Sequence, residues 1–374
     1  MKLSAALRLP AIAGLCLLTI SAAAAEFPSK AGAVSVVTVT KGLEHPWGLA
    51  FLPDGRMLVT ERPGRIRIVD SDGHLSKPIA GVPEVYARGE GGLLDVALDP
   101  AFATNRLIYF AFAEPGAGGA ATSVARAKLA GDHLEQLQII FRQRPKVEGS
   151  THFGARLLFL QDGTLLVTLG DRNARDLIAD LKTDLGKIVR INPDGTIPKD
   201  NPFVGRADAS PELYSLGHRN VQGAAINPQT GELWTSEHGA RGGDEINVPK
   251  PGRNYGWDVI SYGTEYSGGK IGEGTSKPGL EQPIYYWDPS IAPSGITFYD
   301  GDRFPAWRGN LFVAALKFRM LVRLEIDGHR VVSEERLLED MGDRLRDVVQ
   351  GPDGYLYLLT DEADGRILRI EPAS

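Results

Sequence analysis

The sequence predicts an all-β protein, a six-bladed β-propeller built from four-stranded antiparallel blades. A pattern of short apolar runs joined by turns recurs six times along the 374 residues. Between the copies, no stretch shows the 3.6-residue periodicity of an amphipathic helix. Because a repeated antiparallel sheet hides its edges best by closing radially, a propeller is the expected arrangement. An array of two-sheet sandwiches is the structural alternative.

The six copies begin about 45 to 75 residues apart, at Leu49, Val96, Arg156, Ala224, Ile296 and Asp347. In three of them an Asp-Gly pair separates the apolar runs, at 54–55, 162–163 and 353–354. Asp and Gly tolerate the positive φ that hairpin turns require. These copies therefore predict antiparallel hairpins.

The longest stretches outside the repeats predict loops at the ends of the blades, where binding groups usually lie. They are 114–123, 171–184, 194–211 and 262–282. No stretch has the composition of a linker between domains. We therefore expect one catalytic propeller domain, residues 26–374.

Residues 1–25 predict a secretory signal peptide. Lys2 and Arg8 give a positive start, an apolar run follows at 9–20, and alanines at 23–25 suit cleavage. The apolar run is too short for a membrane span. The only cysteine, Cys16, lies in this segment, so the exported chain would have no disulfide and would depend on burial for stability.

The charge balance excludes some functions. The chain has 41 basic and 47 acidic residues, a net charge of −6, which argues against a nucleic-acid partner. We find no phosphate-binding loop, no CxxC, HExxH or GxSxG motif, and no GxGxxG between a strand and a helix. Nicotinamide and flavin chemistry are therefore unsupported.

The stretch 214–257 has the composition of a ligand site. It joins the triplet His218-Arg219-Asn220 to a run rich in Gly, Asp and Glu at 236–245. Glycines let backbone carbonyls approach a ligand, carboxylates are oxygen ligands suited to calcium, and Arg suits planar carboxylates. Surface turns collect the same residues, which is the ordinary explanation.

His152 and Asp171 flank the hairpin of the third copy. If its two strands pair around the Asp-Gly turn, their outer ends meet, and these side chains should lie close together. A carboxylate beside an imidazole fixes its tautomer and favours proton uptake, as a general base requires. A surface ion pair is the alternative.

Cations gather where blades are expected to start. Lys317 ends an apolar predicted strand from 311 and needs a partner there. Arg344 and Arg346 alternate at period two and should point to one side. With the arginine of the His-Arg-Asn triplet they favour a shared anionic ligand at the propeller axis. The ordinary explanations are a strand end for the lysine and ion pairs to Asp343 or Asp347 for the arginines.

Several longer motifs extend the pattern: GEGGLLDVALDPAF, THFGARLLF, LGKIVRINPDGTIPKDNPF, LYSLGHRNVQG, SEHGARGGDEIN with NYGW, and RLRDVVQGPDG. With them the sequence resembles the soluble quinoprotein glucose and aldose-sugar dehydrogenases, from Leu43 to the last repeat. That family implies a six-bladed propeller that uses pyrroloquinoline quinone (PQQ) and calcium.

By this resemblance, the family's general base falls on His152, and the carboxylate that orients the base falls on Asp171. The arginine and asparagine beside the quinone oxygens fall on Arg219 and Asn220. In the glucose enzymes a glutamine lies near the sugar, and Glu90 stands at its position in this chain, a change that bears on substrate choice.

The resemblance also assigns the remaining cofactor and metal contacts. Cations facing the cofactor's carboxylates fall on Lys317, Arg344 and Arg346. Backbone carbonyls of Gly239 and Ala240 would hold the cofactor's calcium, with Ala240 replacing the proline of the glucose enzymes.

A second, structural calcium would draw on Glu245 and the carbonyl of Tyr255. The family's long insertions between later blades are absent, so the chain is more similar to the aldose-sugar branch.

The function implied by the resemblance is oxidation of an aldose at its anomeric carbon to a lactone, with electrons passed to an external acceptor. We expect a monomer in the periplasm, where a quinoprotein can reach the respiratory chain. Two other hypotheses are a calcium-dependent lactonase on a six-bladed propeller and a non-catalytic binding propeller. The fold alone does not separate the three.

Overall fold

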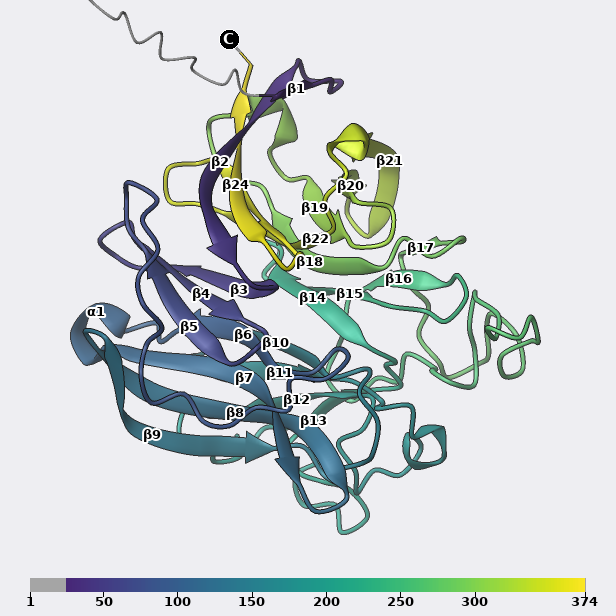
Figure 1. Cartoon of the computed structure of the whole chain (residues 1–374). Coiled ribbons are helices and arrows are strands. Elements are labelled where there is room, and N and C mark those ends of the chain that lie inside the picture. The colour runs from purple at the N-terminus through teal and green to yellow at the C-terminus, as the bar shows by residue number, and fades with distance from the viewer. Residues whose placement is uncertain (1–24, 374) are drawn as a thin grey trace, which may run out of the picture.

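Six antiparallel sheets surround one axis in the computed structural model, which describes residues 25–373 (Figure 1). The first strand of each sheet packs beside the first strand of the next, and the sixth packs against the first. The predicted six-bladed propeller is therefore confirmed. The six innermost strands are β3 (Pro46–Phe51), β6 (Leu93–Leu98), β10 (Gly154–Phe159), β14 (Val221–Ile226), β18 (Pro293–Phe298) and β22 (Leu345–Gln350).

The remaining strands follow outward in each blade. The second strands are β4 (Met57–Glu61), β7 (Leu107–Gly116), β11 (Leu165–Leu169), β15 (Leu233–Glu237), β19 (Leu311–Ala315) and β23 (Leu356–Thr360). The third strands are β5 (Arg65–Val69), β8 (Gly119–Ala130), β12 (Lys187–Ile191), β16 (Asp244–Asn247), β20 (Met320–Asp327) and β24 (Gly365–Pro372). The fourth strands of blades two to five are β9 (His133–Arg142), β13 (Leu213–Leu216), β17 (Tyr285–Trp287) and β21 (Arg330–Leu337).

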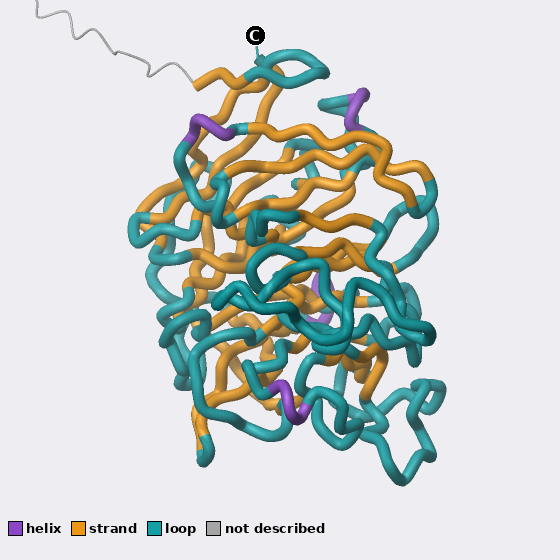
Figure 2. Tube along the Cα trace, turned by 90° about the vertical axis from the view of Figure 1, so that its right-hand side faces the viewer, coloured by secondary structure: helices purple, strands orange, loops and turns teal. Residues whose placement is uncertain are grey.

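The first and last blades depart from four strands. The first has three, and the last has five because β2 (Val34–Leu43) and β1 (Ala25–Phe27) join it. Among the described residues, helix is confined to four short segments, purple in Figure 2. They are α1 (Phe102–Asn105), η1 (Arg175–Leu177), η2 (Pro305–Trp307) and η3 (Glu339–Met341).

The ring is closed by pairing the two ends of the chain. Strand β2, purple in Figure 1, runs antiparallel to β24, yellow, from the pair Val34 and Pro372 to the pair Leu43 and Gly365. The last repeat supplies only β22, β23 and β24. The sixth blade is thus completed by a strand that belongs to no repeat.

The apolar core lies between blades. Six separate clusters fill the six interfaces; Leu58 and Phe110, for example, meet between the first and second blades. The cluster between the third and fourth blades is small, with Leu166, Ile188 and Leu233 as its buried members. Full burial of such side chains contributes roughly 1.5–3 kcal/mol each. Burial between blades therefore holds the ring together.

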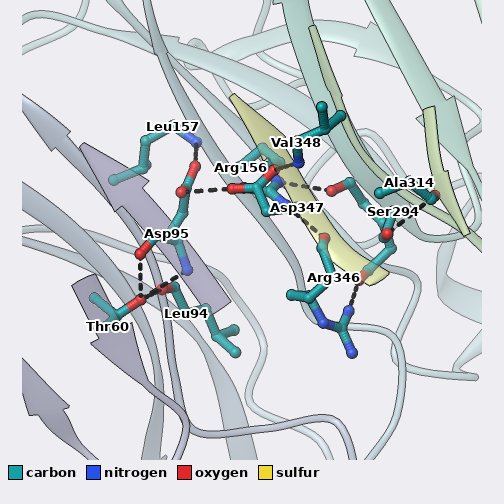
Figure 3. A network of polar contacts seen from close by, with 12 residues as sticks. Thr60, Leu94, Asp95, Arg156, Leu157, Ser294, Ala314, Arg346, Asp347 and Val348 are labelled. Atoms are coloured by element: carbon teal, nitrogen blue, oxygen red, sulfur yellow. Dashed lines mark hydrogen bonds and ion pairs between the residues drawn. The ribbon is translucent and has the colours of Figure 1, made fainter. Parts of the chain in front are cut away.

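All six innermost strands carry a register shift near the same end, where each pairs with its second strand. A bulge bends a strand and re-aims its side chains. Beside these bulges, Arg156 forms ion pairs with Asp347 at 2.9 Å and Asp95 at 3.3 Å (Figure 3). It also donates to the Gln222 carbonyl at 2.7 Å. This cluster joins four blades at the axis.

The loop prediction for 114–123 is wrong. Strands β7 and β8 run through it and leave only Ala117 and Gly118 between them. Its small residues serve close packing, because a Cβ on Gly119 would lie 2.1 Å from the Val147 oxygen. The other three stretches lie outside the strands, and the glycines of the three Asp-Gly pairs have the expected positive φ of 80–86°.

The predicted signal peptide falls on residues that the structure does not describe, apart from Ala25, the first residue of β1. Among residues 25–373, no helix has both the length and the apolar character needed to cross a membrane.

Candidate active site

The predicted site residues come from the connections at one end of the axis, where the innermost strands begin. Glu90 precedes β6, His152 precedes β10, Asn220 precedes β14, and Arg344 precedes β22. Residues more than 250 positions apart in the chain therefore share one end of the propeller. The structure shows how these residues contact one another.

The His152 Nδ1 atom lies 2.6 Å from the Asp171 Oδ1 atom, and both side chains are buried. The same carboxylate accepts the Asn173 amide at 2.8 Å and the Trp257 indole N–H at 2.7 Å. Burial would raise the pKa of Asp171, but the hydrogen bond from His152 and the other donors hold that pKa below its ordinary value. An ionised carboxylate only accepts, so the proton resides on Nδ1 and leaves Nε2 as a proton acceptor.

A chain of hydrogen bonds links this pair to other blades. Glu90 Oε2 accepts the His152 backbone N–H at 2.7 Å and the Asn220 side-chain amide at 3.3 Å. Asn220 Oδ1 accepts from Gln222 at 3.2 Å, and Gln222 Oε1 accepts from Arg346 at 2.8 Å. Blades two, three, four and six thus meet in one polar network.

Arg219 lies beside the acid–base pair. Its carbonyl accepts the Asp171 N–H at 2.8 Å, and Glu237 accepts its own N–H at 2.9 Å. Its guanidinium donates to the carbonyls of His238, at 3.2 Å, and Gly239. No carboxylate among residues 25–373 forms an ion pair with it, and its buried Nε has no partner. The guanidinium of Arg219 therefore has no ion-pair partner at the site, although its charge helps to lower the pKa of Asp171.

The two arginines before and within β22 differ in their partners. Arg346 forms a 2.5 Å ion pair with Asp361. Arg344 donates to the Leu316 carbonyl at 3.2 Å and has no ion pair within the described chain. Pairing of these arginines with Asp343 or Asp347 is thus not observed.

Those two aspartates have other partners, Arg366 and Arg156 respectively. The placement of Lys317 in a strand is also wrong. β19 ends at Ala315, and Lys317 lies in the turn that follows, with its side chain exposed. The turn explains how a lysine can follow a buried apolar strand.

Three of the four candidate metal ligands line one small cavity. Gly239, Glu245 and Tyr255 surround a volume of about 10 Å³ together with Glu237, the room of one water or ion. Burial and the Glu237 carboxylate raise the pKa of Glu245 to about 8. Ala240 is absent from this lining and packs instead in an apolar cluster.

The oxygens around the cavity suit a hard cation. Asn247 donates to Glu237 at 2.8 Å and to Glu245 at 3.1 Å, while its own buried Oδ1 has no partner. The carboxylates of Glu237 and Glu245 are ligands that calcium prefers, whereas Asn247 does not line the cavity and Arg219 does. The Gly239 carbonyl, in contrast, accepts from Arg219, so a cation there would displace that hydrogen bond.

Sequence reasoning missed the roles of several neighbours. Trp257 belongs to the NYGW motif, yet nothing in the sequence shows that its indole reaches Asp171. His238 lies near Arg219, and burial and that charge lower the pKa of His238 to about 3. Asp361 ends up beside Arg346 through the pairing of β22 with β23. Only the position of Trp257 within a family motif could have signalled its importance.

A family model described as glucose/sorbosone dehydrogenase matches residues 43–369. The chain belongs to this family. The resemblance inferred from the motifs is thereby confirmed, and membership of the glucose/sorbosone dehydrogenase family makes the protein an oxidoreductase.

Individual relatives of the chain are also sugar dehydrogenases by name. The chain is 46% identical over 345 residues to the aldose sugar dehydrogenase YliI of Escherichia coli (strain K12), covering 91% of this chain and 93% of that protein. A crystal structure of a glucose dehydrogenase is similar with a TM-score of 0.89 at 52% identity, covering 91% of this chain and all of the other. The PQQ-bound form of the aldose sugar dehydrogenase from Streptomyces coelicolor is similar with a TM-score of 0.76 at 33% identity, covering 90% and 98%.

Proposed function

We propose that this protein oxidises aldose sugars at the anomeric carbon to lactones, using PQQ and calcium and passing electrons to an external acceptor. The observation that carries the proposal is the buried pair of His152 and Asp171 beside the guanidinium of Arg219, which forms no ion pair within residues 25–373. Family membership and the relative solved with PQQ support the same assignment.

In this reaction His152 is the general base. Its Nε2 takes the proton of the anomeric hydroxyl, and Asp171 stabilises the imidazolium that forms. Asp171 remains a carboxylate throughout because three donors share its negative charge. The protein contributes position and charge, and PQQ, when bound, would supply the two-electron acceptor for the hydride of the anomeric carbon.

The residues present fit an anionic cofactor. The buried Nε atoms of Arg219 and Arg346 have no hydrogen-bond partner, which is unusual for buried polar groups. Arg219 and Asn220 would contact the quinone oxygens, and Lys317, Arg344 and Arg346 would face its carboxylates. Because Asp361 already neutralises Arg346, that residue would contribute hydrogen bonds more than net charge.

The two candidate calcium sites differ in how well their residues suit the ion. The cavity lined by Glu245 and Tyr255 also presents the Glu237 carboxylate, and carboxylates are ligands suited to a structural calcium. Because the pKa of Glu245 is raised to about 8, an ion bound there would take the place of its proton. The site at the Gly239 and Ala240 carbonyls requires Arg219 to release the Gly239 oxygen. We assign calcium to both, and the periplasm as the place of action of a monomeric enzyme, as parts of the same proposal.

Dye reduction by the purified chain tests the proposal. Glucose and a panel of aldoses are supplied with and without PQQ and calcium, and activity is expected only when both are added. The ranking of sugars then shows whether Glu90, where glucose enzymes carry Gln, changes the preference. Absence of activity, with lactone hydrolysis in the cofactor-free protein, would instead establish the lactonase; absence of both would leave a binding propeller.

A further inference from the structure

The backbone at His152 is strained. His152 has φ of 57°, in the left-handed region that residues with a Cβ avoid. The opposing segment is bent in the same way, with φ of 54° at Arg172 and 57° at Asn173. The two segments touch so closely that a Cβ on Gly170 would lie 1.8 Å from the His152 carbonyl oxygen. Such a conformation persists only where surrounding contacts impose it.

Arg172 makes contacts on both sides of His152. Its guanidinium donates to the carbonyl of Thr151 and, at 2.8 Å, to that of Gly149. It also lies 3.6 Å from the centre of the Phe153 ring. The next residue, Asn173, donates from its side chain to the Thr151 hydroxyl at 2.8 Å. The residues before and after the base are therefore both fixed from the segment that carries Asp171.

The charge of Arg172 is not used in an ion pair. Its side chain is 2% exposed, and no carboxylate of residues 25–373 lies within ion-pair distance of it. Burial lowers the pKa of Arg172 to about 10, which keeps it protonated at neutral pH. A buried cation without a carboxylate partner is costly for folding, so stability alone does not explain its presence. Asp171 and Glu90 are among the acids whose charge it faces.

We propose that Arg172 is the positioning residue of the general base: it holds the backbone around His152 in the strained conformation that aims the imidazole at Asp171. This inference rests on the proposed function, because it gives His152 the role of base. A guanidinium suits the task because its planar fork reaches several carbonyls at once, which an ammonium does not. Arg172 donates only to backbone carbonyls and makes no hydrogen bond to the His152 imidazole or the Asp171 carboxylate.

Two variants and one control test the inference. Arg172→Met removes the donors at similar length, and Arg172→Lys keeps the charge without the fork. Arg190→Met is the control, because Arg190 is also buried in the third blade but pairs with Asp162 and Asp200. The first readout uses cofactor-free protein: the downfield proton NMR signal of His152 Nδ1–H, identified by its loss in His152→Gln. The second is steady-state dye reduction with PQQ and calcium.

We expect Arg172→Met to lose or shift the downfield signal and to lower kcat roughly 10²-fold with little change in the sugar KM, the usual effect of misplacing a catalytic group. Arg172→Lys should lie between it and the wild type. Arg190→Met should lower thermal stability and leave both readouts unchanged.

An unchanged signal and kcat in Arg172→Met, or equal kcat losses in Arg172→Met and Arg190→Met, would overturn the proposal. If Arg172→Met does not fold, an Arg172→Lys variant identical to wild type in both readouts would also overturn it. A wild type inactive with PQQ would refute the proposed function. Loss of the NMR signal in Arg172→Met would still establish that Arg172 positions the His152 imidazole against Asp171.

Discussion

The carboxylate of Asp171 shows how single residues set the chemistry of the site. It is fully buried, yet three donors from three different segments keep it ionised. Only an ionised Asp171 can hold the proton on His152 Nδ1 and leave Nε2 free. In the proposed mechanism, these neighbours prepare His152 to accept a proton before any substrate binds.

Replacing the base tests its role directly. His152→Ala should lower turnover by roughly 10²–10⁴-fold, the usual loss when general acid–base help is removed, while PQQ still binds. Dye reduction measures turnover and an absorbance titration measures binding. Near-normal turnover would remove His152 from the mechanism.

The indole of Trp257 provides a finer test. Trp257→Phe removes one donor from Asp171, and a hydrogen bond to a charged group is worth about 1.5–3 kcal/mol. We expect kcat to fall at least about tenfold with the sugar KM little changed. Trp307→Phe, which alters a buried tryptophan of another cluster, should change thermal stability and leave kcat as it is; equal kcat values for both variants and the wild type would contradict the prediction.

Glu245 predicts a pH-dependent effect of calcium. Its pKa is raised to about 8 in the folded chain, whereas an unfolded glutamate ionises near 4.3. Ionisation therefore favours the unfolded chain increasingly from about pH 4.5 to 8, and this penalty is absent below that range. Without calcium, the melting temperature of the wild type should fall relative to Glu245→Gln between pH 5 and pH 8.

Adding calcium at pH 8 should restore the wild type and leave Glu245→Gln unchanged, because the ion neutralises the ionised carboxylate. Differential scanning calorimetry at both pH values measures the effect. Equal stabilisation of both proteins by calcium would remove Glu245 from the metal site.

At the scale of elements, the repeated bulge matters more than the repeated hairpin. Each innermost strand shifts register near the end where the site lies. Hydroxyl groups then bridge neighbouring blades there: Thr60 to the Leu94 carbonyl, and Thr168 to the Val221 carbonyl at 3.1 Å. The strands approach one another so closely that some positions admit only glycine.

Gly295 tests this close approach. A Cβ there would lie 1.7 Å from Asp347 Oδ1 and 2.8 Å from the Asp347 Cα, so neither a rotamer change nor a small shift relieves the clash. Gly295→Ala should cost about 1–3 kcal/mol or more in urea unfolding, as overpacking does. Gly269→Ala, whose Cβ meets nothing closer than 3.9 Å, should stay within about 0.5 kcal/mol of the wild type. Equal stabilities of the two variants would count against the close approach.

At the scale of the whole molecule, the side chain of Arg156 links four of the six blades at the axis. It contacts groups from the second, fourth and sixth blades while belonging to the third. Burial raises the pKa of Asp347 to about 6 despite this cation. The buried carboxylates of Asp95 and Asp347 therefore depend on Arg156 as their counter-charge.

Removing that cation should weaken the ring. Arg156→Met leaves Asp95 and Asp347 buried without a counter-charge, which costs about 3–5 kcal/mol. The loss should be smaller at pH 5 than at pH 7, because protonation of Asp347 removes the uncompensated charge. Thermal unfolding at the two pH values measures it, with the exposed Arg330→Met as control. A loss independent of pH would show that the guanidinium acts through packing alone.

The repeats predicted the fold because each copy carries its own local signals. Alternating apolar runs and Asp-Gly turns depend on residues a few positions apart, and six such copies suffice to require closure. The closing strand β2 could not be predicted in the same way. Its partner β24 lies at the other end of the chain, and pairing over that separation leaves no local pattern.

In the site, too, contacts within one hairpin could be predicted and contacts between distant segments could not. The proximity of His152 and Asp171 followed from one hairpin. The pairing of Arg346 with Asp361 did not, because nearer acids in the sequence are taken by Arg156 and Arg366. Contacts between blades depend on which side chain each bulge turns inward, and the sequence does not show the bulges.

Closure by β2 and β24 places the beginning and the end of the described chain side by side in one blade (Figure 1). A short linker could therefore join residues 373 and 25 within this one blade. New termini could be opened in the turn around Gly163, where a Cβ would meet nothing within 4 Å. The protein is in this sense a natural candidate for circular permutation, in which the order of the blades along the gene changes and the ring does not.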